Sequence, residues 1–80
     1  MDKKVSEKLS MIEILNEAIQ REHDSYNYYH SAATFAVKPS AKKMFLKLAE
    51  MELGHANELK RHLLDIEAQM LIDKALTSNF

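Results

Sequence analysis

Apolar side chains recur along two long segments of the chain with the three- and four-residue spacing of an α-helix. In the first segment they form a stripe with Met11, Leu15, Ala18, Ile19, Tyr26, Tyr29, Ala33 and Ala36. In the second segment they form a stripe with Ala41, Phe45, Leu48, Leu59, Leu63, Ile66 and Met70. Such stripes are typical of amphipathic helices that pack along one face.

Short local signals predict where these helices begin and end. Ser10 and Glu13 have the spacing of a capping box, which places the start of the first helix near residue 10. Pro39 disfavours helical geometry at Lys38, and Ser40 can cap the helix that follows. We therefore expect a helix over about 10–36, a turn at 37–40 and a second helix over about 41–75.

The predicted fold is all-α: one domain over residues 1–80, folded as an antiparallel two-helix hairpin. A short C-terminal helical extension is compatible with this prediction. A hairpin has too few elements to enclose its own apolar stripes. An 80-residue chain buries only ~60% of its unfolded surface. We therefore expect it to need a partner.

Ionisable residues interrupt both stripes at mid-length: Glu22 in the first helix, Glu52 and His55 in the second. At 1.5 Å per residue, all three lie about 17–21 Å from the turn, so they fall at one level of the hairpin. A carboxylate within a helical core must be paired, protonated or bound to a cation. Two carboxylates and an imidazole suit iron, manganese or zinc, and these three residues are the candidate metal ligands.

Three ligands from one chain leave such an ion undercoordinated, and a homodimer would supply the missing groups. Two hairpins make a four-helix bundle in which two copies of the trio give a Glu from each of two helices and a Glu-x-x-His from each of the others. That is the ligand set of ferritin-like di-metal bundles. The four carboxylates would balance the charge of two divalent ions.

The residues around this trio carry a family resemblance. The stretch 12–64 resembles one helical half of the rubrerythrin/ferritin-like family: Glu22 to Tyr29 is similar to its first ligand helix, and Phe45 to Ala56 to its Glu-x-x-His helix. The resemblance implies that Glu22, Glu52 and His55 bind iron, two ions per dimer, with Glu52 the bridging ligand. It further implies a ferroxidase that oxidises Fe(II) with O₂ or H₂O₂ for iron storage or detoxification, with the same three residues as its catalytic site.

The chain resembles the encapsulated ferritins more closely, because it has one helix pair where the usual family member has two. That resemblance implies an even-numbered oligomer larger than a dimer, and an encapsulin shell as a partner. The segment 75–80 does not look like a shell-docking tail. Rubrerythrins relay electrons through a cysteine-bound iron domain, and this chain has no Cys. Peroxide reduction with an external donor remains an alternative, as does a non-enzymatic oligomerisation module that uses the trio to fix helix register.

The roles of two tyrosines and a histidine near the trio can each be interpreted in two ways. Tyr26 and Tyr29 either pack in the core or hydrogen-bond a ligand carboxylate. His62 lies seven residues beyond His55. It either contributes to the metal site or its entry path, or is an ordinary interface residue. His23 is expected to be exposed.

Apolar residues outside the two stripes predict a second contact surface, unless the end of the second helix folds back over them. These residues are Tyr28, Phe35, Leu46, Leu53, Leu64 and Leu71.

Composition narrows the function classes. With no Cys, a disulfide framework and a thiolate metal site are excluded. The formal net charge of −1 gives no basic surface for nucleic acid. No apolar run approaches the ~18 residues of a membrane span, and the first eight residues lack the apolar core of a signal peptide. We therefore expect a cytoplasmic protein.

Overall fold

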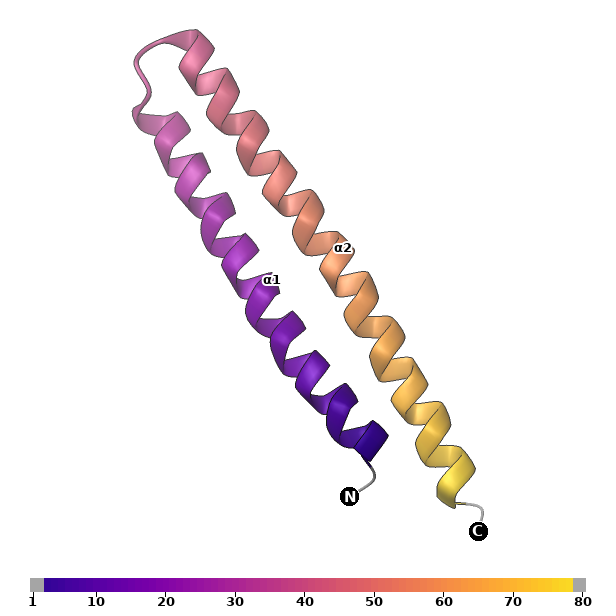
Figure 1. Ribbon diagram of the computed structural model, residues 1–80. Helices are drawn as coiled ribbons and strands as arrows, with labels where there is room; N and C mark the ends of the chain where they lie inside the picture. The colour runs from indigo at the N-terminus through magenta and orange to yellow at the C-terminus, as the bar shows by residue number, and fades with distance from the viewer. Residues whose placement is uncertain (1–2, 79–80) are drawn as a thin grey trace.

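The computed structural model describes residues 3–78 of the chain, and the side chains of residues 7–76. Two antiparallel helices, α1 (Lys3–Phe35) and α2 (Pro39–Ser78), lie side by side (Figure 1). The hairpin measures 65 × 16 × 12 Å. Its radius of gyration is 18.3 Å, whereas a compact domain of this length has about 12 Å. The predicted all-α hairpin is confirmed, and its shape is a rod.

The first helix begins earlier than its sequence predicts. It starts at Lys3 and not near residue 10, and Ser10 is an exposed residue within it. The residues before Ser10 are mostly strong helix formers, so the helix continues through the capping-box spacing without a break. Lys8 forms an ion pair with Asp73 of α2, which ties this early part of α1 to the partner helix.

The turn comprises residues 36–38, slightly earlier than the predicted 37–40. The N–H of Ala36 donates to the carbonyl of Ala32 at 3.0 Å, and the N–H of Lys42 donates to the carbonyl of Lys38 at 3.0 Å. Pro39 therefore occupies the first helical position of α2, where its missing N–H costs nothing. Ser40 lies inside the helix and does not begin it.

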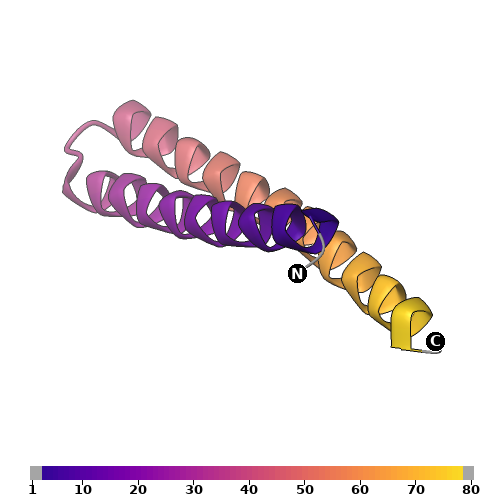
Figure 2. The same ribbon diagram turned by 60° about the horizontal axis from the view of Figure 1, so that its bottom comes forward.

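The second helix runs without interruption to Ser78, three residues beyond the predicted end. Figure 2 shows α2 continuing past the start of α1. The alternative in which the end of this helix folds back over the off-stripe leucines is therefore wrong. Two predictions concern residues that lie partly outside the described range: that the first eight residues are not a signal peptide, and that the segment 75–80 is not a shell-docking tail.

Only very small side chains are fully buried between the two helices over the described residues. Within the described part of the chain, the buried residues are Ala33, Ala49 and Ala56. Met11 and His55, both predicted on the inner stripes, are about half exposed, at 49% for Met11 and 53% for the His55 side chain. The other stripe residues are half-buried or buried. A single hairpin therefore has almost no hydrophobic core.

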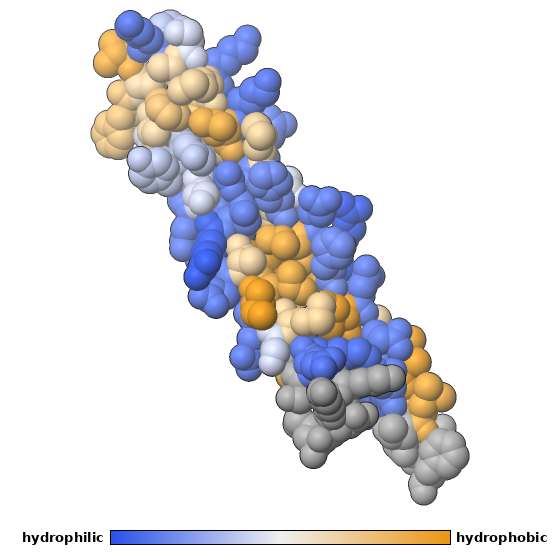
Figure 3. Space-filling view, in the orientation of Figure 1, coloured by the Kyte–Doolittle hydropathy of each residue, from blue (hydrophilic) through white to orange (hydrophobic). Residues whose placement is uncertain are grey.

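Large apolar side chains remain on the surface of the hairpin. Figure 3 shows apolar residues gathered near the turn and again toward the other end, with a polar band between them. The predicted off-stripe residues are indeed exposed, from Leu53 at 42% to Phe35 at 83%. Over the described residues, neither helix has an apolar stretch long enough to cross a membrane.

Candidate metal centre

The structure brings Glu22, Glu52 and His55 together at mid-length of the hairpin. Each offers a ligand atom, and these atoms all lie within 4.8 Å of one another. The Nδ1 of His55 is 3.6 Å from Oε2 of Glu22 and 3.8 Å from Oε2 of Glu52. These distances are too long for hydrogen bonds. They fit two ligands of one ion, which sit about 3.0–3.8 Å apart when each is about 2.1 Å from the metal.

Helix geometry explains why the three groups converge. Glu22 and Glu52 occupy the positions on α1 and α2 that turn toward the opposite helix, and their side chains are 25% and 22% exposed. His55 follows Glu52 by three residues, which turns it about 60° to one side of the contact line. Its side chain therefore stays 53% exposed, beside the carboxylates and open to the outside of the hairpin.

One oxygen at this site lacks a partner. The Oε2 atom of Glu22 is buried and accepts no hydrogen bond from any described residue. A buried carboxylate oxygen without a partner costs about 1–3 kcal/mol or more. A cation held between Glu22, Glu52 and His55 would remove that cost, so the residues present fit a metal ion.

The electrostatics of the trio agree with this interpretation. The pKa of Glu22 is raised above its ordinary value, first because its protonated form can share its proton with Glu52, and then by burial and the charge of Glu52. The neighbouring His55 acts in the opposite direction and lowers this pKa. Glu22 and Glu52 therefore repel each other in the metal-free protein, and a divalent cation would relieve that repulsion.

The two tyrosines beside the trio pack as aromatic residues. Tyr26 and Tyr29 are half-buried; the ring of Tyr26 lies 5.7 Å from that of His30, and Tyr29 meets Tyr28 edge to face at 5.5 Å. Among the described residues, neither hydroxyl forms a hydrogen bond with a ligand carboxylate. Both interpretations of Tyr26 and Tyr29 therefore stay predictions.

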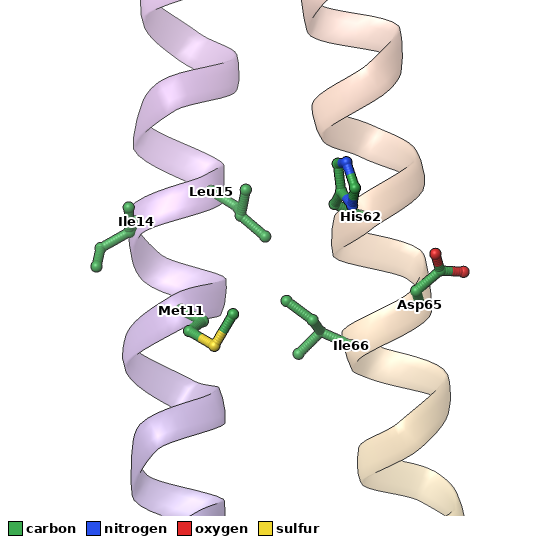
Figure 4. Close-up of a pocket in the computed structure, with 6 residues that line it drawn as sticks. All are labelled: Met11, Ile14, Leu15, His62, Asp65 and Ile66. Atoms are coloured by element: carbon green, nitrogen blue, oxygen red, sulfur yellow. The ribbon is translucent and has the colours of Figure 1, made fainter.

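An apolar hollow lies on the face of the hairpin to which His55 turns. Its volume is 380 Å³, and Figure 4 shows the side chains that line it, with Leu15 and Ile66 both pointing into the space between the helices and Ile66 at the level of Met11. His62 belongs to this hollow, seven residues after His55 and hence on the same side of α2. We call this side the front face; it includes Met11, Ile14, His55 and His62.

The opposite side, the back face, carries a second hollow. Its volume is 270 Å³, and it is lined by Glu22, His23, Tyr26, Asn27 and Leu53. Sequence reasoning missed this hollow because it treated His23 as exposed. That prediction is wrong: His23 is half-buried, and its Nε2 atom is enclosed without a hydrogen-bond partner among the described residues. Its position directly after Glu22 was the available signal.

Comparison with known proteins gives the family. The family model described as Rubrerythrin matches residues 3–74, which is almost the whole chain. The search of curated proteins found no match, and the search of solved structures found none either. With this match across the ligand-bearing parts of both helices, the chain belongs to the rubrerythrin family of ferritin-like proteins.

Proposed function

We propose that this protein is a di-iron ferroxidase whose site is completed by a second copy of the chain. The observation that carries the proposal is the convergence of Glu22, Glu52 and His55 around a buried carboxylate oxygen that accepts no hydrogen bond from the described residues. Members of the family typically bind iron. Carboxylate and imidazole ligands suit that metal, with manganese and zinc as substitutes.

The front face supports the homodimer. Among the described residues only three alanines are fully buried, so the stability of the hairpin requires further apolar contact. Exposed Met11 and Ile14 and the apolar hollow beside them lie on the same face as the open side of His55. A second hairpin placed on this face would cover the apolar surface and bring its own trio to the same site.

The ligand count then becomes complete. Two trios provide four carboxylates and two imidazoles, the set that ferritin-like bundles use for two ions. Four negative charges match two divalent cations, so the assembled and loaded site would be neutral. With a single hairpin the same ions would have only three protein ligands and would lie at an open surface.

The reaction follows from the chemistry of that pair. Two Fe(II) substrate ions give up one electron each, and the two electrons with two protons reduce O₂ to H₂O₂, or reduce H₂O₂ to two waters. Bound iron supplies the electrons. The chain supplies the binding groups: Glu22, Glu52 and His55 of both copies would hold the two ions, and the four carboxylates would offset four of the six positive charges of the ferric pair.

The test is Fe(II) oxidation by the assembled protein, followed by oxygen consumption and by the absorbance of ferric product. Glu52→Ala should abolish oxidation, and Glu58→Ala is the control, because Glu58 is an exposed glutamate on the same helix. Undiminished oxidation in Glu52→Ala would overturn the proposal. A metal-indifferent protein would instead support the oligomerisation module, in which the trio serves only to fix register.

A further inference from the structure

The hollow on the back face shares one residue, Glu22, with the candidate metal centre. Glu22 lines this hollow and also contributes its buried oxygen to the metal-ligand group. The residue that follows it, His23, and one helical turn further on Tyr26 and Asn27, form the rest of the α1 side. An ion in this hollow would therefore already be in contact with one residue of the metal centre.

The two hollows differ in the chemistry of their walls. The front hollow is lined mainly by aliphatic and thioether side chains of α1 and α2. The back hollow offers a carboxylate from Glu22, an imidazole from His23, a phenol from Tyr26 and an amide from Asn27. The walls of both hollows are mainly apolar, but only the back hollow combines a carboxylate with imidazole, phenol and amide groups, whose oxygen and nitrogen atoms can replace part of the hydration shell of a cation.

Helical phase places the two hollows on opposite sides of the hairpin. On α2, His55 lies about 60° to one side of Glu52, and Leu53 lies about 100° to the other. On α1, His23 is about 100° beyond Glu22, whereas Ile14 is turned about 80° the other way. Within the dimer, a second copy that covers the front face therefore leaves the back hollow open; the inference requires that any further contact of the assembly through the exposed leucines of α2 leaves Leu53 uncovered.

From this arrangement we infer that the back hollow is the entry route by which divalent metal ions reach the assembled centre, with His23 as a transient ligand on the way. The inference rests on the proposed function, since it requires a metal centre closed on its front by a second copy. The Nε2 atom of His23 is enclosed and has no hydrogen-bond partner among the described residues, which leaves it available as a ligand for an incoming cation.

Leu53 is the apolar wall of this entrance and provides the test. Leu46 lies seven residues earlier on the same side of α2, with almost the same exposure, 44% against 42% for Leu53. Only Leu53 lines the hollow. Leu53→Trp should therefore fill the entrance, whereas Leu46→Trp places the same side chain on the same face away from it.

The experiment measures loading of preassembled, metal-free protein with Co(II), followed by stopped-flow absorbance of the bound metal. In Leu53→Trp the rate of loading should fall by at least about tenfold, with the final cobalt content unchanged, because a blocked route raises a barrier and leaves the site intact. Leu46→Trp should load like the wild type. His23→Leu should slow loading and release together and leave the dissociation constant unchanged.

Three results would overturn the inference. Leu53→Trp could load at the wild-type rate, or both tryptophan variants could load equally slowly, or loading could occur at the rate at which the assembly dissociates. A wild-type protein that binds no cobalt and oxidises no Fe(II) would contradict the proposed function itself. Normal wild-type loading with unaffected variants would contradict the entry route alone.

Discussion

Replacing Glu52 with Gln should stabilise the metal-free protein, because the paired carboxylates of Glu22 and Glu52 repel each other. Their ligand oxygens lie within 4.8 Å. At that separation two unit charges interact by about 0.9 kcal/mol in water and about 3.5 kcal/mol at an effective dielectric constant of 20. Both side chains are partly exposed, at 25% and 22%, so solvent screening favours the lower end. We expect a gain of about 1 kcal/mol per chain.

The pH dependence of this gain is fixed by the pKa of Glu22. Its folded pKa is raised above the ordinary 4.5. Protonation of Glu22 therefore favours the folded state: its stabilising contribution is fully present below about pH 4.5 and is lost as the pH rises through the raised pKa. The gain in stability from Glu52→Gln should develop as the pH rises through the raised pKa of Glu22. It should vanish in acid, where Glu22 in the wild type is already neutral.

Thermal unfolding followed by circular dichroism measures the effect, with chelator present and protein concentration fixed. A gain of about 1 kcal/mol corresponds to a rise of about 4–8 °C in the melting temperature of a small domain. With Fe(II) added anaerobically the order should reverse, since the wild type gains about 2.7 kcal/mol at a hundredfold excess over Kd and the variant has lost a ligand. If Glu52→Gln lowers the melting temperature of the metal-free protein at neutral pH, Glu52 is a structural partner and the reasoning is refuted.

Three further substitutions test the fold and the front face. Gly54→Ala should raise stability by about 1 kcal/mol, because nothing lies within 4 Å of the added Cβ; a loss in urea unfolding would show that a neighbouring chain approaches there. Ala56→Leu should cost about 1–3 kcal/mol by overpacking a fully buried position, while Ala68→Leu at an exposed position should be nearly neutral in the same assay. Ile14→Glu should shift sedimentation toward single chains and lower the helix content, since Ile14 is 64% exposed in the hairpin and the single hairpin lacks a core of its own; an unchanged mass would exclude the front face as the interface.

Much of the hairpin could be predicted from the sequence, because helical periodicity and a single proline determine it. The starts and ends of the two helices could not be predicted with the same accuracy. The capping-box spacing at Ser10 was a local signal, and it was outweighed by the helix-forming residues before it and by the ion pair between Lys8 and Asp73. The residues at the contact between the helices were also only partly predicted: Ala49 and Ala56 are buried there although neither belongs to the predicted apolar stripes.

The candidate site was accessible to sequence reasoning for a different reason. Glu22, Glu52 and His55 interrupt otherwise apolar stripes, and equal distances from the turn place them at one level. The back hollow was not predictable in this way. It depends on His23 and Leu53, which sit on either side of the groove between the helices and belong to no stripe.

The most direct test of the central claim is native mass spectrometry of metal-free protein before and after anaerobic addition of Fe(II). The account predicts an even-numbered assembly that binds two irons per pair of chains, and loss of that iron in Glu52→Ala. A protein that keeps one mass and binds no iron, or a Glu52→Ala variant that keeps the full iron content, would contradict it.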